Sequence, residues 1–508
     1  MAKDGTEFSR IRSFLWPINR LELVKFVPLM IIFFLISINY HLLRIAKDAL
    51  IITAPNSGAE VLPFLKVWVV LPAALLEAFI FTRLMNRFSK EKVFYIIIGF
   101  MLTFLLFFAL IFYPYRESLY PDQFANFLQS HLPPGCKGFV AIIRYWMFSL
   151  FYVIAESWSF LVLTVLVWGF ANDVTSIEES GRFYALFGIA INFSGILTGE
   201  LANFLTSSNT IHISKYTKML GGTTPWDQTV YIFLGIILVC GILAIATYRW
   251  IHVHILPPDH TARKNLPKEE KPRMSIRETL AYVAKSKYLI SIAMIVLSYN
   301  IVINFTEVLW KAQLKELYPD PQHYAAYTSK VVLCIGCLAT LGSIFVSGNL
   351  IRRSGWKVTA LITPIIVTVT GLGFFYFLFF EQFMKGSPIL ILGLTPLALA
   401  VFFGSLQNAC TRASKYTVFD STKEIAFIPL SPESRMKGKA AIDGIGSRLG
   451  KSGSSLILQV LLIFFNTLLS CSPIIFAAVL LIIPIWILAI NVVSKKFGVL
   501  TQENKAST

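Results

Sequence analysis

The chain has 508 residues, of which 56% are hydrophobic and 14% charged, and its mean hydropathy is +0.66. These values exclude an ordinary soluble domain of this size, which needs a larger share of charged and polar surface. The net charge of +17 could suit nucleic acid, but its distribution along the chain fits membrane topology, so no nucleic-acid partner is expected.

Twelve apolar stretches follow one another along the chain, each long enough for a helix of about 20 residues that crosses a bilayer. They are 24–43, 62–82, 93–113, 141–170, 183–205, 229–251, 288–309, 327–350, 359–380, 388–411, 446–469 and 473–493. The predicted fold class is an all-α polytopic membrane protein with twelve transmembrane helices. Membrane lipids are its expected surroundings.

Lysine and arginine are concentrated in the two tails and in every second loop. Loops rich in these residues stay on the cytoplasmic side of a membrane, so both termini are expected to be cytoplasmic. The first apolar run has no small-residue cleavage site and is long enough to remain in the membrane, so a cleaved signal is not expected.

A polar linker divides the predicted spans into two sets of six. The expected organisation is an N-terminal segment 1–23, a six-helix half 24–251, a linker 252–287, a second half 288–493 and a tail 494–508. Short basic loops, "FTRLMNRFSKEKV" and "SGNLIRRSGWKV", follow the second span of each half. Parallel six-helix halves of the major-facilitator type place the substrate between them.

Charged residues occur within or beside several predicted spans. Glu156 lies well inside 141–170, Glu307 lies near the end of 288–309, and Lys47, Lys311 and Lys451 lie at the mouths of three spans. A charge near the centre of a membrane helix costs roughly 2.5 to 3.5 kcal/mol on insertion scales, so such residues usually face a cavity. Lysine ammonium groups bind phosphate oxygens as point charges, so this cavity suits a nucleoside polyphosphate.

The two acids need a different role, because a carboxylate repels phosphate. They could accept hydrogen bonds from ribose or base, pair with the lysines when the site is empty, or bind a proton. Four further charges in or beside spans, Lys66, Glu77, Glu200 and Lys330, either pair within the bundle or extend towards its surface; no role in transport is assigned to them.

Motifs for catalysis and metal binding are incomplete. "GIGSRLGKSG" resembles a phosphate-binding loop, but the pattern requires glycine at position 445, where the chain has Ile445. Cys334 and Cys337 form a CxxC without a second pair, inside a predicted span. We expect no enzyme activity, no metal and no cofactor.

Several segments resemble the nucleotide transporter family of obligate intracellular bacteria and plastids, the ATP/ADP translocases. They are "FLWPI", "PFLKVW", "WGFAN", "RFYALFG", "EVLWK", "KEIAFIPL" and "GKAAIDGIGSRLGKSG", and the likeness runs from about Phe14 to about Lys496. The resemblance implies twelve spans and exchange of host ATP for ADP across the bacterial inner membrane. It also leaves open proton-coupled net import of one or several nucleoside triphosphates, such as GTP, ATP or UTP. The protein is expected to be a monomer.

The resemblance also implies site residues. Family lysines and acids fall on Lys47, Glu156, Glu307 and Lys451, which are therefore the expected substrate-binding residues. Further candidates beside them are Arg44, Arg144, Asn304 and Lys311. Three neighbours depart from the exchanger pattern: Ile45 replaces an acid, Ser157 a leucine and Ser454 a glycine. The first change leaves the choice between exchange and import open, and a membrane-bound enzyme or a membrane scaffold remain as other classes.

Overall fold

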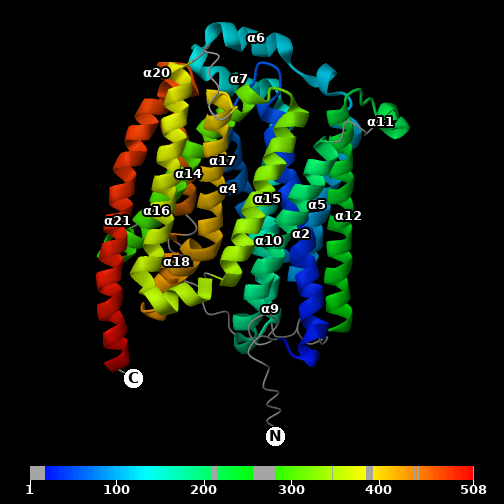
Figure 1. The fold of residues 1–508 in the computed structure, drawn as a ribbon. Coiled ribbons are helices and arrows are strands. Elements are labelled where there is room, and N and C mark those ends of the chain that lie inside the picture. The colour runs from blue at the N-terminus through cyan, green and yellow to red at the C-terminus, as the bar shows by residue number, and fades with distance from the viewer. Residues whose placement is uncertain are drawn as a thin grey trace.

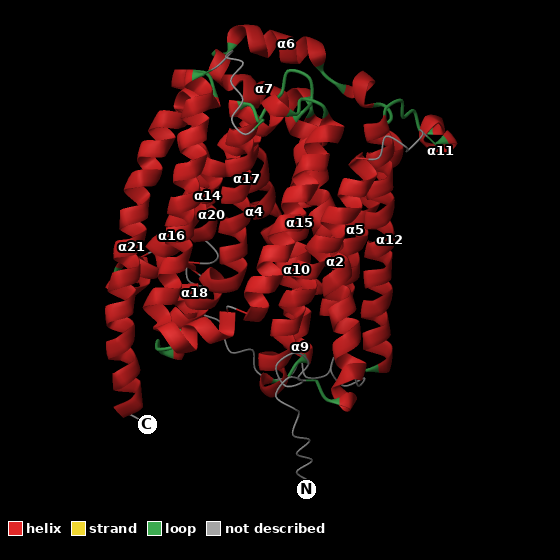
Figure 2. Cartoon of the chain, in the orientation of Figure 1, coloured by secondary structure: helices red, strands yellow, loops and turns green. Residues whose placement is uncertain are grey.

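The computed structural model describes residues 18–207, 214–255, 281–345, 347–384, 393–439, 441–442 and 446–506. Over these residues the chain is helical and has no strand. The helices form one upright bundle, in which α2 begins and α21 ends at the same end (Figure 1). We call this the terminal end. Short helices α6, α7 and α11 lie across the opposite, distal end (Figures 1 and 2).

The first part of the chain forms long helices joined by short ones. These are α2 (Arg20–Ile52), α3 (Val61–Leu65), η1 (Lys66–Val70), α4 (Leu71–Arg87), α5 (Lys90–Phe107), η2 (Phe108–Phe112), η3 (Arg116–Leu119), α6 (Asp122–His131), η4 (Pro134–Cys136), α7 (Lys137–Arg144), α8 (Trp146–Ser157), η5 (Trp158–Val167), α9 (Trp168–Val174), α10 (Ile177–Ser207), α11 (Lys215–Met219) and α12 (Pro225–His254). Here η1, η2 and η5 are π-helical segments that continue the neighbouring α-helices.

The second part has the same character. It comprises α14 (Lys287–Leu317), α15 (Pro321–Phe345), α16 (Ser347–Phe383), α17 (Pro396–Ser414), η7 (Lys415–Phe419), α18 (Asp420–Ala426), α19 (Pro432–Lys439), α20 (Ser447–Phe465) and α21 (Leu468–Ala506). Most of the predicted linker 252–287 falls outside the described residues.

Ten helices among the described residues are long and apolar enough to cross a membrane. The chain is therefore a polytopic membrane protein. The other two predicted spans coincide with shorter helices: 388–411 with α17, and 446–469 with the apolar stretch Leu449–Phe465 of α20.

The structure corrects three predicted boundaries. Predicted span 141–170 was wrong at its start, because α7 ends at Arg144 and non-helical Tyr145 separates it from α8. The predicted ends of the first and seventh spans were also too early. Helix α2 continues to Ile52 and α14 to Leu317, so Lys47 and Lys311 lie inside long helices and not at their mouths.

Helices α10 and α15 pack closely and antiparallel through small residues. At the distal end the Gln322 side chain donates to the carbonyl oxygen of Thr206, at 2.8 Å. A Cβ added to Gly199 would lie 2.6 Å from the backbone nitrogen of Leu333, and one added to Gly336 would lie 2.8 Å from that of Ile196. Backbones approach this closely only where side chains are absent.

Replacing Gly199 by alanine is therefore expected to weaken the bundle. The new methyl group would overlap the backbone of Leu333, and overpacking of this kind costs about 1 to 3 kcal/mol. Gly188→Ala on the same helix is the matched control, because a Cβ there meets nothing within 4 Å. Thermal unfolding in detergent should give a lower midpoint for Gly199→Ala than for the control, and equal midpoints would contradict this packing.

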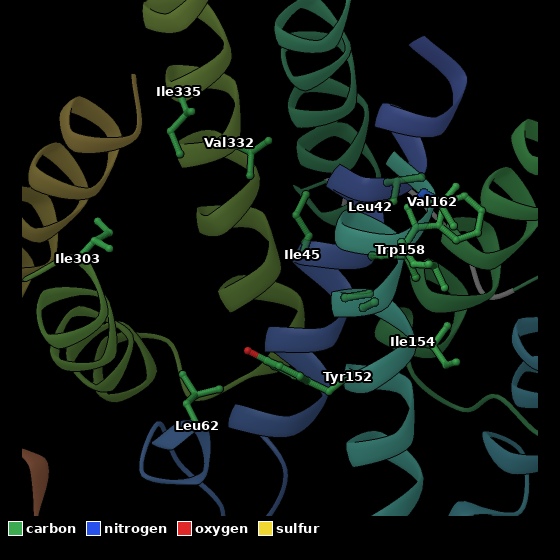
Figure 3. Packing of buried hydrophobic residues seen from close by; sticks show 14 of the residues in the cluster. Leu42, Ile45, Leu62, Tyr152, Ile154, Trp158, Val162, Ile303, Val332 and Ile335 are labelled. Atoms are coloured by element: carbon green, nitrogen blue, oxygen red, sulfur yellow. The ribbon is translucent and has the colours of Figure 1, made fainter. Parts of the chain in front are cut away.

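The apolar core continues from this interface into α2. Leu42 and Ile45 of α2 are both fully buried. Figure 3 shows Ile45 between the ribbons of α2 and α15, with Val332 and Ile335 on α15. The position where the sequence departs from the exchanger pattern is therefore an apolar packing position in this chain.

Candidate functional site

A polar cluster lies inside the bundle, where α2, η1, α8, α14, α17 and α20 meet. On the α2 side, the Lys47 ammonium forms an ion pair and hydrogen bond with the Glu156 carboxylate of α8. The same ammonium lies 4.2 Å from the ring centroid of Tyr152, one turn earlier on α8, a cation–π contact. The sequence predicted both Lys47 and Glu156, and the structure brings them together.

A second set of ion pairs forms a continuous chain through the cluster. Lys311 Nζ lies 2.8 Å from Asp48 Oδ2 and 3.0 Å from Glu307 Oε1. The other Glu307 oxygen, Oε2, lies 2.8 Å from Arg412 Nη2 on α17. Asp48 and Lys311 join α2 to α14, and their side chains are only 3% and 6% exposed. Pairing with a lysine, one of the roles left open for Glu307, is thus present, within a longer chain of charges.

Asn304 connects three elements one turn before Glu307 on α14. Its Oδ1 accepts a hydrogen bond from the Lys66 ammonium of η1. Its Nδ2 donates to Ser454 Oγ and Ser455 Oγ of α20, at 2.8 and 3.1 Å. Lys66, for which no role in transport was predicted, is therefore part of this cluster.

Three cations of the cluster have no acid partner among the residues that the structure describes, and one of these, Lys66, is hydrogen-bonded to Asn304. The Arg44 guanidinium and the Lys451 ammonium take part in none of the ion pairs found there. Lys451 still interacts electrostatically with Glu156, Arg412 and Glu307, and Arg44 interacts with Glu307. Both cations therefore face the same group of acids and are available to an anion.

Solvent exposure within the cluster increases towards the terminal end. The Asp48–Lys311 pair is almost completely buried, whereas the Glu156 side chain is 36% exposed. Lys451, in the second turn of α20, is exposed although it lies among charges from several helices. The charges nearest the terminal end are therefore the ones most accessible to solvent in this conformation.

Hydrogen bonds between distant segments close the distal end. The Lys315 ammonium of α14 donates to the carbonyl oxygen of Ser57, just beyond α2. The Gln459 amide of α20 donates to the carbonyl oxygen of Pro63, at 2.9 Å, and its Oε1 accepts from the Trp68 indole at 3.0 Å. These contacts lie on the distal side of Asp48 and Lys311, which explains why that pair is shielded from solvent.

Arg144 is the one candidate that the structure places apart from the cluster. Its guanidinium lies 2.7 Å from Asp122 and donates to Asn126 at 2.6 Å, both on α6. It therefore attaches the distal helix α6 to the end of α7.

Sequence reasoning missed several members of the cluster. Asp48 directly follows Lys47 in "LRIAKD", and Arg412 and Lys415 were taken as loop charges beyond the tenth predicted span. Asp48 could have been found, because an acid next to a lysine inside a long helix needs a partner. In the described part of the chain, no group of three or more His, Cys, Asp or Glu side chains could hold a metal ion.

Comparison with known proteins gives a consistent result. A family model described as "TLC ATP/ADP transporter" matches residues 1–497. ADP,ATP carrier protein 1 of Chlamydia muridarum (strain MoPn / Nigg) is 41% identical over 494 residues, covering 96% of this chain and 92% of that protein. The chloroplastic ADP,ATP carrier protein 1 of Arabidopsis thaliana is 37% identical over 488 residues, covering 95% and 75%. ADP,ATP carrier protein 1 of Rickettsia typhi (strain ATCC VR-144 / Wilmington) is 34% identical over 508 residues, covering 99% of each chain.

Proposed function

The chain belongs to the TLC ATP/ADP transporter family, and we propose that it exchanges ATP for ADP across a membrane and catalyses no reaction. The observation that carries the proposal is the polar cluster, in which Arg44 and Lys451 form no ion pair with an acid of the described residues and solvent exposure increases towards the terminal end. A polyphosphate anion is the ligand that such a site suits. The names of the relatives favour exchange over proton-coupled net import of nucleotides.

In the proposed mode of binding, the phosphates first meet Arg44 and Lys451. They then displace Glu156 from Lys47, so that Lys47 becomes a further phosphate ligand. The cluster can accept this negative charge because its cations outnumber its acids. The cations are Arg44, Lys47, Lys66, Lys311, Arg412, Lys415 and Lys451, and the acids are Asp48, Glu156, Glu307 and Asp420. Of these, Lys415 of η7 and Asp420 of α18 form an adjoining ion pair, at 2.9 Å. An empty site keeps this excess positive charge, which disfavours reorientation without substrate and so favours exchange.

The proposed architecture has twelve membrane helices in two halves of the major-facilitator type, with α17 and α20 as the two spans beyond the ten long ones. The halves would rock about the cluster, which is open at the terminal end and closed at the distal end in this conformation. We place both termini in the cytoplasm and the protein in the bacterial inner membrane. The basic tails and loops support this orientation.

Transport in proteoliposomes tests the function. Labelled ATP is expected to enter vesicles loaded with ADP or ATP, and not empty vesicles or vesicles loaded with GTP, CTP or UTP. The rate of uptake should not change when a pH gradient or an uncoupler is applied, because no proton moves with the nucleotide. Uptake into empty vesicles that collapses with an uncoupler would instead establish net import, and hydrolysis without uptake would establish an enzyme.

A further inference from the structure

Two of the charged residues within predicted spans lie on the outside of the bundle, away from the polar cluster. Glu200 of α10 and Lys330 of α15 are both exposed. The described residues include no ion pair or hydrogen bond made by the Glu200 carboxylate or the Lys330 ammonium. Charges that face lipid without a partner are costly, so these two need an occupant.

The packing of α10 on α15 places both charges on one face. Gly199 contacts Leu333, and Gly336 contacts Ile196. On α10, the residue that follows each contacting residue in the sequence points to one side of the helix pair. Because α15 runs antiparallel to α10, the residue that follows each contacting residue of α15 points to the same side. Glu200 follows Gly199, and Lys330 lies one turn before Cys334, which follows Leu333. Glu200 and Lys330 therefore flank the α10–α15 contact on a common side, which we call the α10–α15 seam.

The other exposed residues of the seam show that it faces lipid. They are Phe193, Leu197 and Phe204 of α10, and Leu338 and Leu341 of α15. The opposite side of the two helices faces α2, where Gly195 contacts His41. The seam is thus on the outer surface, on the side away from the polar cluster.

The depth of the two charges suits a lipid headgroup. At 1.5 Å per residue, Glu200 lies roughly 10 Å below the distal end of α10, and Lys330 roughly 14 Å below the distal end of α15. The spans Arg182–Ser207 and Pro321–Ile344 are longer than the roughly 20 residues that the hydrocarbon requires. Both charges therefore lie below the boundary between headgroups and hydrocarbon, Glu200 by roughly 6 Å and Lys330 by roughly 11 Å, and the long Lys330 side chain can extend towards a headgroup drawn inwards.

We propose that the α10–α15 seam binds a zwitterionic phospholipid with a primary ammonium headgroup, whose phosphate contacts Lys330 and whose ammonium contacts Glu200. The charge complementarity is direct, since one acid and one base flank the same helix contact and differ in depth by less than about one helical turn. A primary ammonium donates hydrogen bonds to a carboxylate, which a quaternary ammonium cannot. An anionic headgroup would satisfy Lys330 but would be repelled by Glu200.

A second copy of the chain fits the seam less well than a lipid. Helices that associate in membranes meet at small residues that let their backbones approach. The exposed seam instead presents phenylalanine and leucine side chains around the two charges. Flexible acyl chains pack against such a surface more readily than a second rigid helix pair.

Native mass spectrometry of the purified protein tests the proposal. Phosphatidylethanolamine, phosphatidylcholine and phosphatidylglycerol are added in turn at equal concentration, and bound lipids are counted. The wild type should retain phosphatidylethanolamine about ten-fold more than the other two, the effect of one charge-assisted hydrogen bond. Lys218→Gln, which removes an exposed lysine of the short helix α11, is the matched control and should keep this preference.

The variants separate the two contacts. Glu200→Gln should lose the preference over phosphatidylcholine and phosphatidylglycerol, whereas Lys330→Gln should weaken binding of all three lipids. The double variant Glu200→Lys with Lys330→Glu keeps complementary charges and should recover the preference for phosphatidylethanolamine. Equal wild-type binding of phosphatidylglycerol, or no change in either single variant, would overturn the proposal. A dimer lost in Lys330→Gln would also overturn it, by showing that a second copy covers the seam.

Discussion

Replacing Lys311 by glutamine is expected to slow nucleotide exchange more than about a hundred-fold. Lys311 is the only ion-pair partner of Asp48 in the described structure, and Asp48 Oδ1 already lacks a hydrogen bond. Without Lys311, a carboxylate that is 3% exposed would be buried without compensation. Removing one member of a buried pair costs about 3 to 5 kcal/mol. The unpaired charge destabilises the conformation in which the distal end is closed. Each exchange cycle passes through that conformation, so transport slows.

The order of severity among variants tests this explanation. Asp48→Asn should slow exchange less than Lys311→Gln does, because Lys311 still forms an ion pair with Glu307, at 3.0 Å. The double variant Asp48→Asn with Lys311→Gln should transport faster than Lys311→Gln alone, because no unpaired charge remains. Lys315→Gln, one turn further along α14, loses only a hydrogen bond to a backbone carbonyl and is the matched control. Equal rates for Lys311→Gln and Lys315→Gln in counterflow assays would rule out this role of the Asp48–Lys311 pair.

The sequence predicted the membrane class and most of the spans because apolar length is a local property. It did not predict where helices end. Hydropathy falls as soon as charged residues appear, so α2 and α14 seemed to stop before Lys47 and Lys311, although both helices continue beyond them. The same effect assigned Arg412 to a loop. A hydropathy average falls by the same amount for a charge inside a polar cluster as for a charge in a loop, so it does not distinguish the two.

The candidate residues were partly predictable, but their partners were not. Glu156 and Glu307 stood out because an acid in an apolar stretch is rare. The pairs Lys47–Glu156 and Asp48–Lys311 join residues far apart in the chain, and no local pattern specifies such pairs. Ile45 shows the converse. Sequence comparison suggested that it changes the charge of the empty site, whereas the structure has it fully buried among apolar side chains.

Lys451→Gln should raise the half-saturation concentration for ADP about ten-fold or more, with little loss of stability. Its ammonium has no acid partner to leave unpaired, so the variant loses only the proposed phosphate contact, a charge-assisted hydrogen bond worth about 1.5 to 3 kcal/mol. Uptake of labelled ADP over a range of concentrations measures the change. Half-saturation close to wild type would remove Lys451 from the phosphate site.

Lys47→Gln tests whether Lys47 only neutralises Glu156 or also binds phosphate. Its loss frees the Glu156 carboxylate, which would then repel the polyphosphate, so the affinity for ADP should fall further than in Lys451→Gln. Adding Glu156→Gln removes that repulsion. If Lys47 serves only to neutralise Glu156, the double variant should recover the wild-type affinity. If Lys47 also binds phosphate, as proposed, the double variant should remain about ten-fold weaker than wild type. Glu156 is partly exposed and stays hydrated when unpaired, so the wild type, Lys47→Gln and the double variant should unfold at similar temperatures. Differences in affinity between them then reflect binding of ADP and not loss of folded protein.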